Sequence, residues 1–272
     1  MERSVTLRQP QKLVFGNGCS EQVEEDLSCL GCSRVLIVTS GPIVPLVMPL
    51  SEQFKNKGIS ANVWQAGDRE PTIEMLEEGL EVCRKVRADA VIGFGGGSVL
   101  DLAKLIAALC NSDQAVMDVL GIDKLNSRGV TLACLPTTAG TGSEVSPNAI
   151  LFDPSDQLKK GVVSKHLVAD AAYIDPLLTH TVPAHVTAAT GMDALVHCIE
   201  AYANRFAHAI TDHYALEGIR LIAANLTKAY KKGLDAEARE KLSLGSMYGG
   251  LCLGPVNTGA VHALAYPLGG KY

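Results

Sequence analysis

Residues 88–104 read Ala-Asp-Ala-Val-Ile-Gly-Phe-Gly-Gly-Gly-Ser-Val-Leu-Asp-Leu-Ala-Lys, and this stretch decides the fold. The apolar run 88–94 predicts a buried strand, and the pattern of residues 98–109 predicts a helix. The glycines between them let the backbone approach a pyrophosphate, to which the first turn of a helix offers free N–H groups. The loop matches neither GxGxxG nor a Walker motif, and a tight strand–helix turn uses the same glycines. On its own, the loop leaves both interpretations open.

Strand and helix patterns alternate over the first 150 residues. Further buried strands are predicted at 34–39, 61–65 and 130–135. Helices are predicted at 46–57, with Pro49 in the first turn, and after Thr72, which can cap the helix. Repeated β-α-β units imply a parallel sheet with helices on both faces. The Gly- and Ser-rich segment 139–173 becomes mildly β-like and is expected to form the floor of a cleft.

The pattern of the sequence changes from strand-like to helical near residue 175. Strand signals fade, and Ala-rich amphipathic segments predict helices at 184–204, 208–232, 236–253 and 258–268. We therefore expect an α/β domain over residues 1–178, with a Rossmann-like parallel sheet, followed by an all-α domain over residues 179–272.

Composition restricts the class of protein. The chain has 272 residues, of which 47% are hydrophobic and 19% charged, as expected of a soluble α/β protein with a sizeable core. The net charge of −5 and the lack of a large basic cluster argue against a nucleic-acid partner. No apolar run is long enough to span a bilayer, so no membrane partner is expected. The N-terminus lacks the pattern of a signal peptide, which predicts a cytoplasmic location.

A carboxylate and an imidazole stand four residues apart in the stretch 191–197, Gly-Met-Asp-Ala-Leu-Val-His. In a helix this spacing brings Asp193 and His197 to one face, where they can grip one divalent metal. A surface pair or a buried hydrogen bond has the same spacing. The glycine-rich loop upstream and His262 downstream favour the metal interpretation.

A second polar loop follows the strand at 130–135. Residues 135–144 read Leu-Pro-Thr-Thr-Ala-Gly-Thr-Gly-Ser-Glu and combine four hydroxyls with two glycines. Open α/β sheets bind ligands at the carboxyl ends of their strands, so this loop predicts a binding wall. A plain polar turn is the alternative.

Three motifs, at 95–104, 136–144 and 191–197, occur in the order found in the iron-containing (group III) alcohol dehydrogenases, which the chain resembles over nearly its whole length. Phe-Gly-Asn-Gly at 15–18 and His262 with the following Pro-Leu-Gly also fit. The resemblance implies a dinucleotide-binding domain and a helical metal-binding domain, with NAD or NADP between them. It also implies Fe²⁺, or Zn²⁺ or another divalent metal. The implied reaction moves a hydride between NAD(P) and a small primary or secondary alcohol, or an aldehyde or ketone, and a homo-oligomer is expected.

Residue roles are carried over position by position. The implied metal ligands are Asp193, His197 and His262, and Tyr266 and Lys159 complete the catalytic set. Lys160 is the competing register for Lys159, which matches a lysine that lines the nicotinamide pocket. The implied cofactor-binding set comprises Ser40, Gly95, Gly96, Gly97, Ser98, Asp101, Thr137, Thr138, Thr141, Ser146 and Lys159.

The sequence departs from the family pattern at several places. The family continues past the position of Tyr272 with a His-containing segment that supplies a fourth ligand, so we expect a fragment of a longer enzyme with an incomplete helical domain. Apolar helix faces should then lie uncovered. Tyr266 stands where a further His is often found, and a phenol is a poorer base near neutral pH. Ser40 replaces a frequent Asp, which predicts relaxed discrimination against NADP. Glu70 stands where an Asn is common.

Two alternatives have other functions. A related metal-independent enzyme of the maleylacetate reductase type would lack the metal ligands, and Asp193, His197 and His262 argue against it. A nucleotide-binding fragment, catalytically impaired because the fourth ligand is missing, is the non-enzymatic alternative. The sequence does not choose among alcohol or aldehyde substrates.

Overall fold

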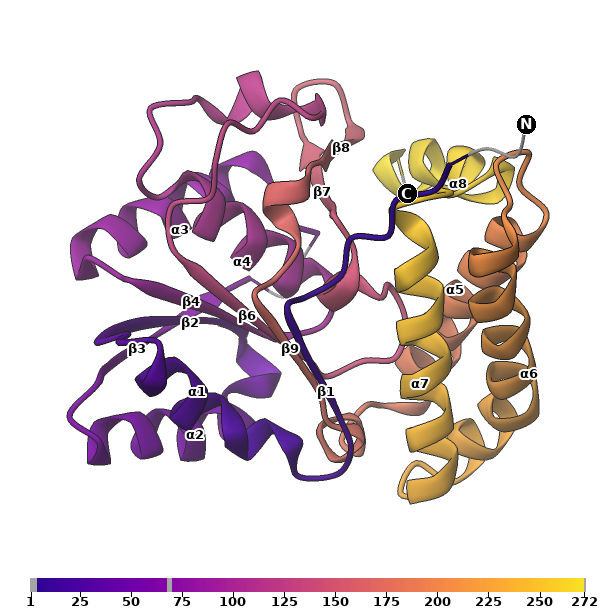
Figure 1. Cartoon of the computed structure of the whole chain (residues 1–272), viewed down its shortest axis with the longest axis horizontal. Coiled ribbons are helices and arrows are strands. Elements are labelled where there is room, and N and C mark those ends of the chain that lie inside the picture. The colour runs from indigo at the N-terminus through magenta and orange to yellow at the C-terminus, as the bar shows by residue number, and fades with distance from the viewer. Residues whose placement is uncertain (1–3, 68–69, 272) are drawn as a thin grey trace.

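The structure, a computed structural model, describes residues 4–67 and 70–271 (Figure 1). A parallel sheet with its helices forms one part of the molecule, and a group of helices forms the other. The fold class predicted from the sequence is therefore confirmed.

The central sheet has six parallel strands in the order β1-β9-β6-β4-β2-β3. Their bounds are Lys12–Phe15 (β1), Arg34–Ser40 (β2), Ser60–Ala66 (β3), Ala90–Gly95 (β4), Thr131–Pro136 (β6) and Ala171–Ile174 (β9). The chain runs from β2 outward to β3 and then returns to β4 on the other side of β2. This reversal makes the carboxyl ends of β2 and β4 the switch point at which open α/β sheets bind ligands.

Both faces of the sheet are covered by helices, as predicted (Figure 1). Helices α1 (Val23–Cys29) and α2 (Val44–Asn56) cover one face, and α3 (Ile73–Val86) and α4 (Gly97–Leu109) cover the other. Alternate residues of a strand point to opposite faces. Accordingly, Val35 and Ile37 of β2 join the core beneath α1 and α2, whereas Leu36 and Val38 join the core beneath α3 and α4.

Three details of the first half differ from the prediction. Strand β1 was not predicted, and β9, in the expected cleft floor, is a strand of the main sheet. Helix α2 begins at Val44, with Pro45 rather than Pro49 in its first turn. Proline suits the first turn because the N–H that it lacks has no helical acceptor there.

The remainder of segment 139–173 forms a small second sheet. Strands β7 (Asn148–Asp153) and β8 (Leu158–Val163) pair as an antiparallel hairpin, and β5 (Gly121–Ile122) adds to β8. The hairpin projects beside the helical part, where β8 contacts the last helix, α8.

The helical part contains α5 (Ala184–Tyr202), α6 (Ala209–Lys231), α7 (Ala236–Leu253) and α8 (Ala260–Lys271). The first three pack around a core that includes Ala194, Cys198 and Ile222. Apolar side chains such as Ile199 of α5 and Leu264 of α8 are exposed, which agrees with the expectation of uncovered helix faces. None of the helices in the described part of the chain has the length and apolarity needed to cross a membrane.

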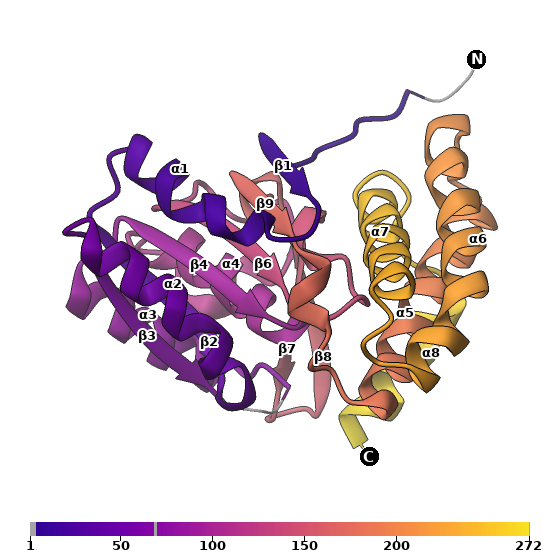
Figure 2. The same ribbon diagram turned by 90° about the horizontal axis from the view of Figure 1, so that it is seen from below.

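The two parts meet along α7 (Figure 2). Ala172 and Ile174 of β9 pack against Met247 and Leu251 of α7. Next to this contact, the loop after β6 touches the helix backbone. Gly142 of the loop adopts φ +61°, and a Cβ on Gly250 of α7 would lie 2.7 Å from the Gly142 Cα. Glycine on both sides therefore allows this polar loop to lie directly on the helix.

Substituting Gly250 by Ala should destabilise the chain because neither backbone can retreat without moving the loop. Overpacking of this kind costs about 1–3 kcal/mol of unfolding free energy, which urea denaturation measures. Gly254→Ala is the matched control, since its Cβ would make only an ordinary 3.4 Å contact with Pro147. Equal stability of the two variants would show that the close contact is absent.

Candidate active site

A cavity of about 550 Å³ lies between the carboxyl edge of the sheet and helices α5 and α8. Ten residues predicted for the site line it, namely Gly97, Ser98, Asp101, Thr141, Ser146, Lys159, Asp193, His197, His262 and Tyr266. They come from α4, the loop after β6, β8, α5 and α8. The cavity thus joins elements of both parts of the molecule.

A larger hollow, of about 1370 Å³, lies at the opposite, amino edge of the sheet. Arginines line it, but several of them already donate hydrogen bonds to backbone carbonyls. Arg34 donates to the carbonyl of Arg87 at 2.5 Å, and Arg84 donates to that of Cys110 at 3.0 Å, at the end of α4. The carbonyl groups at the carboxyl end of a helix stabilise a nearby cation, so we assign these arginines a structural role.

The amino end of α4 forms one wall of the cavity. Gly96 is the extended cap residue and Gly97 is the first helical residue. A Cβ on Gly97 would lie 2.6 Å from the Thr141 hydroxyl oxygen, so only glycine fits while Thr141 keeps its place. Free N–H groups at a helix start attract anions, and this wall is therefore suited to a phosphate.

The other five predicted cofactor residues lie beside the cavity rather than in its lining. Gly95 is the last residue of β4 and lies directly beside the side chain of Val99. Thr138 packs against Gly96. The N–H of Thr137 donates to the carbonyl of Gly95 at 2.9 Å. The hydroxyl of Thr137 is buried and has no hydrogen-bond partner within residues 4–67 and 70–271.

Ser40 is the fifth of these residues. It is the last residue of β2 and therefore lies at the switch point of the sheet.

Two oppositely charged side chains of α4, Lys104 and Asp101, hold the loop after β6 (residues 137–147, the binding loop) in place. The fully buried ammonium of Lys104 donates to the carbonyl of Ser143 at 2.8 Å and to the carbonyl of Asn148. The carboxylate of Asp101 accepts from the Ser143 hydroxyl and from the N–H of Ile150. Burial lowers the pKa of Lys104 and raises that of Asp101, and the attraction between the two charges opposes both shifts.

This network changes the interpretation of Asp101. It lines the cavity, but both of its oxygens accept hydrogen bonds from the protein, so its main contacts are structural. The role of Lys104 was missed, although its i,i+3 spacing from Asp101 is a signal that the two share a helix face.

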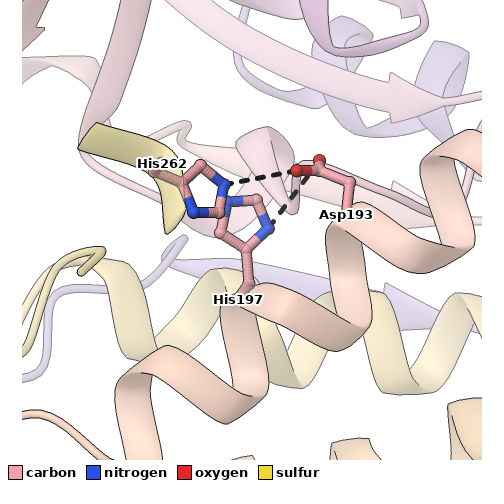
Figure 3. A group of neighbouring side chains, drawn as sticks. All are labelled: Asp193, His197 and His262. Carbon is pink, nitrogen blue, oxygen red and sulfur yellow. Dashed lines mark hydrogen bonds and ion pairs between the residues drawn. The ribbon is translucent and has the colours of Figure 1, made fainter. Parts of the chain in front are cut away.

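Asp193 and His197 on α5 meet His262 on α8 (Figure 3). One donor atom from each residue lies within 4.8 Å of the others. Nε2 of His262 is 3.3 Å from Oδ1 of Asp193, and Nδ1 of His197 is 3.8 Å from Oδ2. The two imidazole rings stack with centroids 4.3 Å apart.

This donor set fits a divalent metal. Nδ1 of His197 is buried and accepts or donates no hydrogen bond among the described residues. An unpartnered buried ring nitrogen is costly unless a ligand completes it. Here it faces a carboxylate and a second imidazole, a nitrogen and oxygen set that suits iron, zinc and related ions.

Electrostatics favour the metal-binding form of Asp193 and His197 and oppose that of His262. Burial lowers the pKa of His197 despite the attraction of Asp193, which favours the neutral imidazole that binds metals. Burial opposes ionisation of Asp193, but His262 and His197 hold its pKa below the usual value. Burial also opposes the charge on His262, and its bonds to Asp193 and Glu200 raise its pKa nonetheless.

Glu200 is a site residue that sequence reasoning missed. Its buried carboxylate lies 2.6 Å from Nδ1 of His262. The signal was present, since Asp193, His197 and Glu200 are spaced i, i+4 and i+7 on one helix face. Its own pKa is held low by backbone N–H groups and His262, although burial opposes this.

Lys159 of β8 and Tyr266 of α8 both line the cavity. Nζ of Lys159 pairs with Glu70 at 2.9 Å, whereas Lys160 pairs with Asp153 and Asp156 away from the cavity lining. Of the two candidate registers, the structure thus places Lys159 in the cavity. Tyr266 packs edge-on against His262, and burial raises the pKa of its phenol to about 12, so it stays protonated at neutral pH.

Comparison with known proteins agrees with this geometry. The family described as "Iron-containing alcohol dehydrogenase" matches residues 10–176. The description "Fe-containing alcohol dehydrogenase family, C-terminal" matches residues 187–272. Both parts of the chain therefore fall into one class of protein. The chain belongs to the iron-containing alcohol dehydrogenase family.

Individual relatives are similar over almost the whole chain. "Long-chain-alcohol dehydrogenase 1" of Geobacillus thermodenitrificans is 40% identical over 94% of this chain and 66% of its own length. A crystal structure of a 1,3-propanediol oxidoreductase superposes with TM-score 0.94 at 33% identity, covering 99% of this chain and 71% of that one. A sulfoacetaldehyde reductase from Bifidobacterium kashiwanohense, solved with NAD+, gives TM-score 0.89 at 28% identity and covers 98% and 71%. The chain thus spans about two thirds of the length of these relatives.

Glu144, in the same binding loop, should make stability depend on pH. Burial raises the pKa of this carboxyl from 4.5 to about 7, so the folded chain keeps a proton that the unfolded chain loses between these values. Stability should therefore fall as the pH rises through this window, by about 3 kcal/mol in total. We expect Glu144→Gln to gain about 2–3 kcal/mol relative to the parent chain between pH 5 and pH 8 in urea titrations.

The control for this titration is Glu77→Gln, since Glu77 is an exposed side chain on α3. Its difference from the parent chain should stay nearly constant between the two pH values. A constant difference for Glu144→Gln as well would contradict the burial of a neutral carboxyl at this place.

Proposed function

We propose that the chain carries the cofactor site and three metal ligands of an NAD(P)-dependent alcohol dehydrogenase. The reaction moves a hydride between a nicotinamide and the carbon of an alcohol, or of an aldehyde or ketone. One observation carries the proposal: Asp193, His197 and His262 converge on the wall of a cavity whose other wall is the amino end of α4. Relatives named as alcohol dehydrogenases, and one solved with NAD+, support it.

The dinucleotide would lie along the carboxyl edge of the sheet. Its pyrophosphate would bind the free N–H groups at the start of α4, beside Gly96, Gly97 and Ser98. The hydroxyl of Thr137, which has no hydrogen-bond partner among the described residues, lies next to this loop. Ser40, at the end of β2, would lie near the ribose because the switch point is between β2 and β4. The nicotinamide would then reach the part of the cavity lined by Lys159 and the metal ligands.

The metal would be held by Asp193, His197 and His262. Iron is the metal of the family description, and the same donors suit zinc. When bound, it supplies a Lewis acid that stabilises negative charge on the substrate oxygen.

The remaining residues of the cavity prepare the reaction. The protonated phenol of Tyr266 can donate a hydrogen bond to an oxygen beside His262. Lys159 contributes positive charge, which Glu70 holds in place. Alignment of the reacting carbons and exclusion of water then supply the rest of the catalysis.

We also infer that the two parts of the molecule act as a nucleotide domain, residues 1–178, and a metal-binding domain, residues 179–272. The boundary falls in the connection Pro176–Thr179, between the last strand of the sheet and helix α5. The cavity is lined by residues of both parts, so a change of angle between the domains would open or close it.

Removal of Asp193 tests the metal site. The parent chain should bind one Zn²⁺ in calorimetric titration, and Asp193→Ala should weaken binding by about 100-fold or more because one of the three donors is lost. Oxidation of NADH by a short aldehyde should fall in parallel. Asp156→Asn, at the exposed hairpin turn, is the control and should match the parent chain.

Two results would contradict the proposal. Unchanged zinc affinity in Asp193→Ala would place the metal elsewhere. A parent chain that binds NADH and zinc but never oxidises NADH would be the nucleotide-binding alternative.

Ser40 should permit either cofactor. A serine neither attracts nor repels a 2′-phosphate strongly, so kcat/KM with NADH and NADPH should agree within about tenfold. Ser40→Asp should lower kcat/KM for NADPH by about tenfold or more, since a carboxylate repels the phosphate. Ser60→Asp, at the opposite edge of the same sheet, should leave the ratio unchanged. A strong preference of the parent chain for NADH would refute the expectation.

A further inference from the structure

Glu200 is buried in a position that the proposed chemistry does not use directly. It follows His197 by three residues on α5, and its side chain is 7% exposed. It lies outside the lining of the cavity and so touches neither substrate nor cofactor there. A buried carboxylate is costly unless it is fully paired, so its partners indicate its role.

Among the described residues, the hydrogen-bond partners of the Glu200 carboxylate lie at the start of α8 or directly before it. Oε2 accepts a hydrogen bond from the N–H of Gly259 at 2.9 Å and lies 2.6 Å from Nδ1 of His262. Oε1 accepts from the N–H of Val261 at 2.5 Å and from that of His262 at 3.4 Å. One carboxylate of α5 thus binds the first free N–H groups of α8 and the imidazole that follows them. The charge also suits the positive end of the helix dipole.

The contact with the ring decides where the proton of His262 resides. Both ring nitrogens face carboxylates, which only accept hydrogen bonds, but Nδ1 is 2.6 Å from Glu200 and Nε2 is 3.3 Å from Asp193. The single proton of the neutral ring is therefore assigned to Nδ1, in the shorter bond. The lone pair of the neutral ring is then on Nε2. That atom faces Asp193 at 3.3 Å, on the side of the other two donors.

We propose that Glu200 is a positioning residue that fixes both the tautomer and the orientation of His262 as a metal ligand. It also anchors α8 to α5, so the third ligand keeps its place relative to the two on α5. This inference rests on the proposed metal site, and it assigns to Glu200 the part of a carboxylate behind a ligating histidine.

Glu200→Gln tests the proposal with little change in volume. The amide nitrogen of the glutamine is a hydrogen-bond donor, but each partner of the Glu200 carboxylate named above is also a donor. The nitrogen must face either the N–H of Gly259 and Nδ1–H of His262 or the N–H of Val261, and that contact is lost. We expect zinc affinity to fall by about 10–100-fold, as is usual for loss of such a partner. Glu217→Gln, an exposed change on α6 that breaks a pair with Arg220, is the matched control and should not alter the affinity.

The tautomer of His262 is measured separately, without metal, by ¹⁵N NMR at a pH where the ring is neutral. The parent chain should show the proton on Nδ1, and Glu200→Gln should show a mixture. A parent chain with the proton on Nε2 overturns the proposal, even if the variant does not fold. A variant that loses helix stability but keeps the parent tautomer and zinc affinity would reduce Glu200 to a helix cap, and this also overturns it.

These results separate the inference from the proposed function. If the parent chain binds no zinc, the proposed metal site fails, while the zinc-free tautomer still tests Glu200. If the parent chain and Glu200→Gln bind zinc equally well, the metal site stands and the positioning role fails.

Discussion

Both halves of the site depend on the hydrogen bonds that the buried ammonium of Lys104 donates. The ammonium ties α4 to the loop after β6 and to the start of β7 by bonds to the carbonyls of Ser143 and Asn148. The amino end of α4 forms the phosphate wall, and the loop that Lys104 holds packs against α7 through Gly142 and Gly250. This loop and strand β9 both pack against α7, so together they set the position of the helical part and of the metal ligands on α5 and α8. A buried charge with several acceptors fixes one geometry, because any other leaves it unpaired.

Features that depend on local sequence were predicted well. The strands that became β2, β4 and β6, the helix after the glycines, and the pairing of Asp193 with His197 follow from periodicity and spacing within a single element. The start of α2 was placed late because the sequence offers prolines at 42, 45 and 49, and the structure places Pro45 in the first turn and Pro49 inside the helix. Strands β1 and β9 have four residues each, too short for a clear pattern, and their burial is set by neighbours distant in the chain.

The parts of the site that depend on tertiary contacts were harder to predict. His262 was joined to Asp193 through a family resemblance, since nothing local brings α8 to α5. Glu200 has the correct helical spacing, but most carboxylates on helices are solvated, and only the position of α8 shows that this one is buried. Lys104 presented the reverse difficulty, because a lysine is expected at the surface and this one is fully buried.

The central claim is that one cavity holds a metal on the α5 and α8 side and a dinucleotide on the α4 side. Anomalous diffraction from crystals grown with Zn²⁺ and NAD+ tests it directly. The account predicts a zinc peak about 2.0–2.2 Å from donor atoms of Asp193, His197 and His262, with the pyrophosphate at the start of α4. A zinc ion bound by cysteine sulfur, or a dinucleotide outside this cavity, would contradict it.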